Sequence, residues 1–310
     1  MDKENKRSKS TISVKKVIST LITIIILLVG MLRGDDLFNK IFAQAQEVHN
    51  VEGLNNLTVQ TGPGCISKID VNEDVLRVYF FDVDQADSIL VVNNGEAMLI
   101  DAGKNDSGKM ILGEIKKIGV NKLNYVVGTH PHEDHIGGLD DVINGMNIGT
   151  VLMPKTTTTT KTYEDVIDAV SNKNKKIKVP KVGEKFKVGN AECEIMSIED
   201  NKENLNLCSI VIRMEYNGIS YLFTGDAEKE NEDKRSWPKT DVLKAGHHGS
   251  STSSSQNFLN QLQPSLIIIS CGKNNDYGHP HKETMQRYNK LGAAIYRTDE
   301  NGDILITQTK

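Results

Sequence analysis

The sequence predicts an α/β domain in which two β-sheets pack face to face with helices on both outer sides. This is a four-layer αββα sandwich, preceded by an N-terminal membrane-anchor helix. Two runs of strand-like segments, each with helical segments of its own, predict the two sheets. Histidines and acids gather directly after several of these segments. Such clusters are typical of a site on loops along one edge of a sandwich.

The N-terminus has the pattern of a membrane signal. Residues 1–16 carry six basic and two acidic side chains, and residues 17–32 are apolar apart from Ser19, Thr20 and Thr23. A basic flank before an apolar run is typical of a signal anchor or of a cleaved secretory signal. At about 1.5 Å per residue the run covers roughly 24 Å of the ~30 Å hydrocarbon core, and flanking lysines can snorkel. We expect residues 1–34 to be a cytoplasmic segment and an uncleaved anchor, with the remainder outside the cell; secretion after cleavage is the alternative.

Residues 35–74 show weak periodicity, which predicts a juxtamembrane linker with one helical stretch at 36–46. The folded domain is expected at residues 75–310. Its strand candidates lie at residues 76–81, 88–92, 97–100, 124–128, 150–153, 184–188, 191–197, 208–216, 220–224, 241–245, 265–270, 294–297 and 302–307. Its helix candidates lie at residues 109–118, 140–144, 163–171, 227–234, 256–261 and 282–291. Asn-Gly pairs at 94–95 and 217–218 are hairpin signals.

Charge and cysteine content narrow the class of protein. The whole chain has a net charge of −4, and the basic first sixteen residues leave the remainder at −8. An acidic domain argues against broad coating of nucleic acid. A local basic strip, with seven lysines and one glutamate at residues 173–187, can follow a phosphate backbone or be an ordinary solvated face. The four cysteines permit two disulfides, but their wide spacing and strand-like surroundings favour free buried thiols.

Seven of the eight histidines fall into three short clusters. The first cluster has four metal-capable side chains within six residues, namely His130, His132, Asp134 and His135. Imidazole nitrogens and carboxylate oxygens are preferred ligands of Zn²⁺ and related ions. In extended backbone His130 and His132 point to the same side and can hold one ion, while Asp134 and His135 in the following turn face a second. The sequence therefore predicts a multi-histidine site for two metal ions.

A site for two ions also needs a carboxylate that both ions share, and Asp226 is the best candidate. It follows a hydrophobic strand candidate, and Gly225 allows a close approach of the backbone. The structural alternative for Asp226 is the N-cap of a helix that begins at Ala227. Gly137 and Gly138 follow the first histidine cluster and let the backbone leave that turn tightly.

These motifs resemble the metallo-β-lactamase superfamily and, more narrowly, the hydrolase domain of the ComEC competence protein family. The matching stretches are residues 80–88, 99–103, 129–139, 222–228, 241–250, 278–281 and 296–299. The resemblance covers residues 75–310. It implies a metallo-β-lactamase-like hydrolase with a pair of zinc ions, or manganese in their place. It matches His130 and His132 to one ion, Asp134 and His135 to the other, and Asp226 to the bridge.

The same resemblance implies outer-shell residues. Asp101 matches an acid that braces the ligand loop, and Asp82 is a candidate for the same role or an ordinary turn residue. Where the family has glycines near Asp82, this chain has Asp84 and Ala86. These changes leave the metal ligands intact and leave the substrate class open.

The chain departs from the superfamily pattern at one ligand, since no histidine lies between residues 136 and 246. His247 or His248 then supplies the remaining ligand of the first ion, and His279 completes the second. We favour His247 as the ligand and His248 as a proton donor, so that Asp134 and His248 are the candidate catalytic residues. His281 is either a substrate contact or a surface residue ahead of the next helix.

The resemblance and the N-terminus together predict a membrane-anchored extracytoplasmic dinuclear zinc hydrolase. A phosphodiesterase or nuclease is the leading interpretation, with single-stranded DNA or a cell-wall polymer as substrate, because two metal ions suit the charge that builds on a phosphate diester. The alternative enzyme is a phosphorylcholine-type esterase of cell-wall teichoic acid. The alternative that is not an enzyme is a non-catalytic, membrane-tethered metal-binding sensor. The membrane contact is expected through residues 17–32, and the sequence indicates no protein partner.

Overall fold

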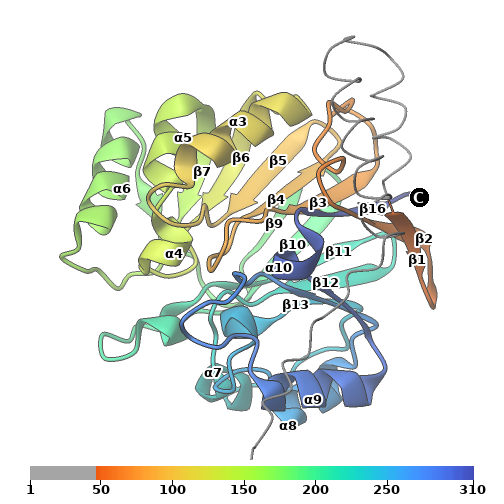
Figure 1. The fold of residues 1–310 in the computed structure, drawn as a ribbon. Coiled ribbons are helices and arrows are strands. Elements are labelled where there is room, and N and C mark those ends of the chain that lie inside the picture. The colour runs from red at the N-terminus through yellow and green to blue at the C-terminus, as the bar shows by residue number, and fades with distance from the viewer. Residues whose placement is uncertain (1–46) are drawn as a thin grey trace, which may run out of the picture. The chain divides into compact units, whose positions relative to one another are not determined.

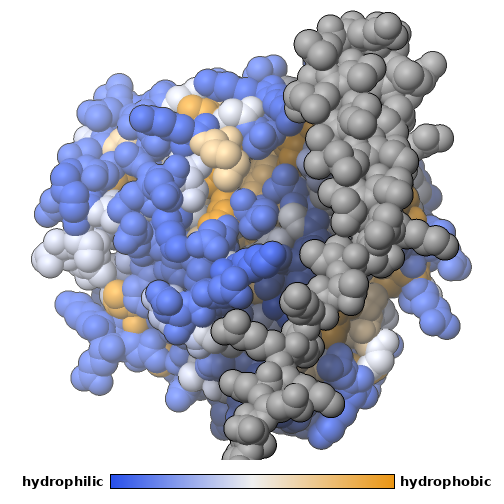
Figure 2. Space-filling model, in the orientation of Figure 1, coloured by the Kyte–Doolittle hydropathy of each residue, from blue (hydrophilic) through white to orange (hydrophobic). Residues whose placement is uncertain are grey.

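The computed structural model describes residues 47–310. The membrane anchor predicted at residues 17–32 and the helix predicted at 36–46 lie outside the described residues, so both stay predictions. Within residues 47–310, no helix combines the length and the apolar character that a bilayer span requires. The face drawn in Figure 2 is mainly hydrophilic there, with apolar side chains in small groups only.

The first sheet has nine strands in the order β1-β2-β16-β3-β4-β5-β6-β7-β8. Its strands are β1 (Glu47–Val51), β2 (Leu54–Thr61), β3 (Leu76–Phe80), β4 (Ile89–Asn93), β5 (Glu96–Ile100), β6 (Lys122–Val127), β7 (Asn147–Leu152), β8 (Ile177–Lys178) and β16 (Ile304–Gln308). Pairing is antiparallel from β1 to β5 and parallel from β5 to β8. The β4–β5 hairpin turns at Asn94 and Gly95, both with positive φ, as the Asn-Gly pair predicts.

The second sheet has seven strands in the order β15-β14-β13-β12-β11-β10-β9. Its strands are β9 (Lys185–Val188), β10 (Ala191–Ser197), β11 (Val211–Tyr216), β12 (Ile219–Phe223), β13 (Val242–Lys244), β14 (Leu266–Ile269) and β15 (Ala294–Arg297). Pairing is antiparallel from β9 to β12 and parallel from β12 to β15. The second predicted hairpin turns at Asn217 and Gly218 between β11 and β12.

Helices cover the outer side of each sheet (Figure 1). Over the first sheet lie α3 (Gly108–Ile118), α5 (Leu139–Gly145) and α6 (Lys161–Asn172), and against the second lie α8 (Gln256–Leu262) and α9 (Lys282–Leu291). The shorter helical segments are α4 (Glu133–Ile136), α7 (Lys229–Asp233), α10 (Thr298–Asn301), η1 (Leu205–Cys208) and η2 (Gly246–Gly249). The helix predicted at residues 256–261 begins as expected, with Ser255 Oγ accepting a hydrogen bond from the backbone N–H of Phe258.

Three separate apolar clusters fill the three boundaries between layers, which confirms the predicted four-layer arrangement of two sheets and outer helices. Strand β3 shows how the sequence encodes this. Leu76, Val78 and Phe80 belong to the cluster between the sheets, whereas Tyr79 and Phe81 belong to the cluster under the first helical layer. Successive side chains of a strand point to opposite faces, so an unbroken apolar run indicates a strand buried on both sides.

The linker predicted at residues 35–74 ends earlier than expected. Strands β1 and β2 belong to the nine-stranded sheet, where Val59 of β2 pairs with Ile306 of β16. The sequence pattern is weak because polar Asn55 and Asn56 separate the buried Leu54 and Leu57. A second correction concerns Cys208, which lies at the end of η1 and not in a strand interior.

All four cysteines are buried and free, as the sequence predicts. Burial raises the pKa of Cys65 to about 11 and that of Cys271 to about 12, so thiolate is scarce near neutral pH. We expect essentially no reaction of the native protein with a thiol reagent such as DTNB at pH 8. Complete denaturation should then release all four thiols. Fast modification of the native protein would contradict the buried positions.

Candidate metal centre

The clustered acids and histidines lie on loops that follow neighbouring parallel strands. Asp101 follows β5, the 130–135 segment follows β6, Asp226 follows β12, and the His247-His248 pair follows β13. Strands β5 and β6 run parallel in the first sheet, as do β12 and β13 in the second. Carboxyl ends of parallel strands meet at one edge of a sheet, and the loops from both sheets converge there.

The backbone at two of these loops is unusual. A Cβ on Gly137 would lie 2.4 Å from the backbone of residues 104–105, and one on Gly138 would lie 2.4 Å from Ala102 O, so close packing demands glycine at both. His247 and His248 both adopt the left-handed conformation, with φ of 48° and 53°. Such residues cost roughly 1–3 kcal/mol each and cluster at functional sites. The conformation directs both neighbouring imidazoles toward Asp226.

Asp226 lies at the centre of the site with an imidazole pair at each carboxylate oxygen. Its Oδ1 lies 3.2 Å from His135 Nε2 and 3.7 Å from His248 Nε2. Its Oδ2 lies 3.8 Å from His130 Nε2 and 3.6 Å from His247 Nε2. The alternative of a helix cap does not hold, because Glu228 is the N-cap of α7. Asp226 thus occupies the position of a carboxylate that two ions can share.

Two ligand groups flank this carboxylate. On the Oδ1 side, Asp134, His135 and His248 join Asp226 with all ligand atoms within 4.8 Å of one another. Asp134 Oδ2 lies 3.3 Å from His248 Nε2 and 3.9 Å from His135 Nε2. On the Oδ2 side, His132 Nδ1 lies 3.0 Å from His130 Nε2. The imidazole of His247 lies on the same side, with its Nε2 3.6 Å from Asp226 Oδ2.

Several buried atoms of this site lack a hydrogen-bond partner among the described residues. They are His135 Nε2, Asp226 Oδ1 and His248 Nε2. The 3.2 Å between His135 Nε2 and Asp226 Oδ1 does not have the angles of a hydrogen bond, which leaves both atoms unsatisfied. Unsatisfied buried polar atoms cost free energy, and metal coordination would satisfy them. The donor set and its spacing suit a pair of divalent ions.

The electrostatics of the cluster keep the ligand atoms ready for cations. Burial holds the pKa of His130 well below its usual range, so that imidazole is neutral. Burial alone would raise the pKa of Asp226, but the imidazoles of His135 and His248 lower it well below the usual range. Burial opposes protonation of His248, yet Asp226 and Asp87 raise its pKa to about 10. Cations that bind here therefore displace protons from imidazoles.

Outer-shell acids orient two of these histidines. Asp101 Oδ2 lies 2.8 Å from His135 Nδ1, and Thr129 donates to Asp101 from its backbone N–H at 2.8 Å and its hydroxyl at 2.7 Å. This is the bracing contact that the sequence predicts for Asp101. Ion pairing of His135 with Asp101 and with Asp226 leaves its Nε2 directed at the shared carboxylate.

The second outer-shell acid is Asp87, which sequence reasoning missed. Its Oδ1 lies 3.3 Å from His248 Nδ1, and its Oδ2 lies 2.8 Å from Lys244 Nζ. Asp87 and Lys244 are each 1% exposed. Asp82, predicted for a similar role, is instead exposed, and its backbone N–H donates to Asp303 Oδ1. Asp87 and Lys244 are each a charged residue within a segment that is otherwise buried. This feature of the sequence could have identified both residues.

His279 lies beside the cluster and outside the tight group of ligand atoms. The backbone N–H of Gly272 donates to Gln85 Oε1 at 3.0 Å, which leaves the Gln85 amide NH₂ to donate to His279 Nδ1 at 3.2 Å. Burial and the neighbouring histidines lower the pKa of His279 to about 4. The imidazole is therefore neutral at pH 7 and carries its proton on Nε2.

His281, for which the sequence left open a substrate contact or a surface position, has both ring nitrogens engaged in holding its own loop. Its Nδ1 accepts from the backbone N–H of Ser251 at 2.8 Å, and its Nε2 lies 3.1 Å from the carbonyl oxygen of Tyr277. A neutral imidazole makes both contacts, so the structure assigns His281 a bracing position.

A hollow of about 280 Å³ opens onto the candidate metal ligands. Its lining residues are Gln85, His132, Glu133, Asp134, Asn206, Asp226, His247, His248, Tyr277 and His279. They include three acids and neither lysine nor arginine. Bound cations would offset these carboxylates for a negatively charged substrate.

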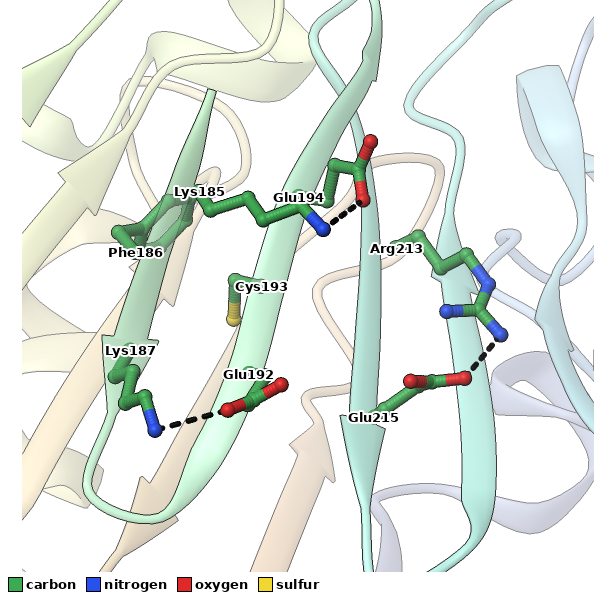
Figure 3. Close-up of a pocket in the computed structure, with 8 residues that line it drawn as sticks. All are labelled: Lys185, Phe186, Lys187, Glu192, Cys193, Glu194, Arg213 and Glu215. Atoms are coloured by element: carbon green, nitrogen blue, oxygen red, sulfur yellow. Dashed lines mark hydrogen bonds and ion pairs between the residues drawn. The ribbon is translucent and has the colours of Figure 1, made fainter. Parts of the chain in front are cut away.

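The basic strip predicted at residues 173–187 does not line the hollow at the histidine cluster. A hollow of about 250 Å³ lies on β9, β10 and β11 of the second sheet, and Figure 3 draws the residues that line it. It shares no lining residue with the hollow at the candidate metal ligands. Lys187 reaches Glu192 at 2.9 Å and Lys185 reaches Glu194 at 3.4 Å (Figure 3). Lys178 pairs with Glu184 as well. These pairs favour the interpretation of the strip as a solvated face.

Residues 81–273 match the sequence profile of the Metallo-beta-lactamase superfamily. The chain therefore belongs to this superfamily, whose members are generally metal-dependent hydrolases.

Several bacterial proteins are similar to this chain, among them the Competence protein ComA of Neisseria gonorrhoeae, which is 27% identical over 239 residues, 75% of this chain and 32% of that protein. The chain is 34% identical to ComE operon protein 3 of Bacillus subtilis (strain 168) over 201 residues, 63% of this chain and 26% of that protein. It is 28% identical to Recombination protein 2 of Haemophilus influenzae over 240 residues, 74% of this chain and 28% of that protein. The chain thus spans about a quarter to a third of the length of these relatives. The solved metallo-β-lactamase fold protein YhfI from Bacillus subtilis is similar in fold, with a TM-score of 0.52 and 9% identity over 75% of this chain and 99% of that one.

Proposed function

We propose that this protein hydrolyses phosphodiesters with two divalent metal ions, zinc or manganese, on the outer face of the cell membrane. The position of Asp226 between two groups of imidazoles carries the proposal. The basic flank and apolar run at residues 1–32 support membrane anchoring. Similarity to competence proteins supports a nucleic acid, such as single-stranded DNA, as the diester.

The geometry supports one change to the ligands predicted from sequence. His130, His132 and His247 would hold one ion, and Asp134, His135 and His248 the other, with Asp226 shared. His248 replaces His279 because His248 Nε2 lies 3.3 Å from Asp134 and 3.7 Å from Asp226. His248 is also 1% exposed, which makes it unsuited to deliver a proton to a departing group. His279 is left free to contact substrate.

Bound at this site, the ion pair would activate water and offset the charge on the phosphoryl oxygens. Hydrolysis forms one bond from the water oxygen to phosphorus, breaks one phosphorus–oxygen ester bond and returns a proton to the departing oxygen. Asp134 borders the hollow with 29% of its side chain exposed. Burial would raise its pKa, but His135 and His248 hold it below the usual range, so the carboxylate is ionised and can orient the attacking water by accepting a hydrogen bond from it. His279 Nε2–H is a neutral donor to a substrate oxygen.

The charge of the hollow favours a diester over a monoester. A diester carries one negative charge at neutral pH, whereas a phosphate monoester carries close to two. Glu133, Asp134 and Asp226 line the hollow without a lysine or arginine among its lining residues. These three carboxylates repel each additional negative charge on the substrate, and the bound ions would have to offset that repulsion as well.

A phosphorylcholine-type esterase acting on cell-wall polymer is the second candidate function. Glu133 and the aromatic ring of Tyr277 line the hollow. A carboxylate and one aromatic face offer part of the environment that binds quaternary ammonium groups, although a full aromatic cage is not formed by the lining residues.

The test uses the full-length chain purified in detergent, with elemental analysis for bound metals. We expect two divalent ions per chain and hydrolysis of bis(p-nitrophenyl) phosphate that EDTA stops and added Zn²⁺ or Mn²⁺ restores. Hydrolysis of p-nitrophenyl phosphate, the matched monoester, should be slower. Metal-loaded protein that cleaves neither single-stranded DNA nor any aryl phosphodiester would contradict the proposal.

A further inference from the structure

An exposed tyrosine lies at the rim of the metal-site hollow. Tyr277 is 68% exposed, the largest exposed fraction among the large hydrophobic side chains of residues 47–310. Its ring stacks on His279, with centroids 5.6 Å apart and planes inclined by 20°. One ring face therefore meets His279, and the high exposure leaves the other face to solvent. Both residues line the same hollow as Asp134 and Asp226.

Hydrogen bonds hold the loop of Tyr277 in place. The Asn275 amide donates to Gly272 O at 2.9 Å and to His279 O at 2.6 Å, and its oxygen accepts from the His279 backbone N–H at 3.0 Å. His281 reaches the carbonyl of Tyr277 and is itself anchored by Ser251. A ring on a braced loop loses little conformational entropy when a ligand stacks on it. The loop thus presents Tyr277 as a preformed platform.

The size of the hollow decides which part of a substrate reaches this platform. At about 280 Å³ it lies at the low end of the ~300–1,000 Å³ of ligand sites. A substituent of a phosphodiester that extends out of such a small hollow would pass its rim, where Tyr277 is exposed. The open face of Tyr277 is the aromatic surface there.

We propose that Tyr277 is a specificity-determining residue whose open ring face stacks with the base of the nucleotide that adjoins the cleaved phosphodiester. This inference rests on the proposed phosphodiesterase function and adds the residue that would select a nucleotide diester. Bases stack on a single flat ring without sequence preference. A quaternary ammonium group is instead bound by a cage of several aromatic rings, and Tyr277 is the one tyrosine, phenylalanine or tryptophan that lines this hollow within the described residues.

The experiment compares three diesters with the same p-nitrophenolate leaving group: the methyl, thymidine-5′ and choline esters of p-nitrophenyl phosphate. Full-length, metal-loaded wild type, Tyr277→Ala and Tyr277→Phe are assayed for kcat and KM. We expect wild type to favour the thymidine ester. Tyr277→Ala should lower kcat/KM for that ester roughly 5- to 150-fold, mainly through KM, and lower that for the methyl ester much less. Tyr277→Phe keeps the ring and should retain the preference.

Each other outcome has a distinct meaning. Absence of methyl ester turnover by metal-loaded wild type would overturn the proposed function itself. Turnover of the methyl ester without a thymidine preference, or a preference that Tyr277→Ala keeps, would overturn base stacking alone. Equal losses on the methyl and thymidine esters would assign the ring to the nitrophenyl group. A selective loss on the choline ester would replace base stacking by ammonium recognition.

Discussion

Replacement of Asp226 by asparagine is expected to lower kcat at least about a thousandfold, because one change weakens both metal positions. Each oxygen of this carboxylate lies within 3.8 Å of two imidazole nitrogens on its own side. Loss of an outer-shell partner costs roughly 10–100-fold in metal affinity or activity, so loss of a ligand shared by two ions should cost more. Asparagine keeps the shape of the side chain, and the Asp226 backbone N–H still donates to Ser209 Oγ at 3.0 Å.

The measurements are bound metal per chain, kcat on an aryl phosphodiester and the far-ultraviolet circular dichroism spectrum. Asp233→Asn is the matched control, because Asp233 is exposed and pairs with Lys229 on the surface of α7. It should retain two ions and full turnover. Asp226→Asn with normal metal content and normal turnover would rule out the shared carboxylate. A wild-type protein that binds two ions without any turnover would instead support a non-catalytic sensor.

The second large effect concerns stability. Lys244→Met is expected to lower the free energy of unfolding by about 3–5 kcal/mol, because it leaves the buried carboxylate of Asp87 without its cation. That is a large fraction of the ~5–15 kcal/mol of a typical domain. Lys244 Nζ also donates to Ala245 O at 2.9 Å, so the change removes two contacts of a fully buried ammonium. Chemical denaturation of the metal-free protein measures the loss.

The double variant Lys244→Met/Asp87→Asn removes both charges and should recover most of the lost stability. Lys229→Met removes a lysine from an exposed pair and should change stability by less than about 0.5 kcal/mol.

The contribution of the Asp87–Lys244 pair to stability also depends on pH. Burial opposes ionisation of Asp87, but Lys244 and His248 lower its pKa to about 2. The pair thus stabilises the fold above the ordinary aspartate pKa of ~4, and this stabilisation is lost as the pH falls through about 2. A Lys244→Met protein as stable as wild type would contradict the buried pair.

The sequence predicted the parts of the site that local pattern encodes. His130, His132, Asp134 and His135 lie within six residues after a buried strand, and the structure brings them around Asp226. The two runs of apolar segments predicted the layers of the fold. Side chains alternate along strands such as β3, and this alternation places them in two separate apolar clusters.

The parts of the site and of the fold that were not predicted depend on backbone conformations and residue pairings that the local sequence pattern does not encode. Adjacent residues usually point in different directions, and only two consecutive left-handed residues turn both His247 and His248 toward Asp226. Asp87 and Lys244 were missed because each meets its partner from a distant segment of the chain. Strand β2 was missed because its partner, β16, follows it by more than two hundred residues.

The position of β16 between β2 and β3 has a consequence for biosynthesis. Thr61 pairs with Ile304, and Phe80 pairs with the same residue from the other side. Both neighbouring strands keep unpaired edges until residues 304–308 leave the ribosome. Long-range pairing of this kind is slow, and open strand edges favour aggregation. The first sheet therefore cannot be completed before residues 304–308 are available, and export that delivers the chain unfolded would confine its assembly to the destination compartment.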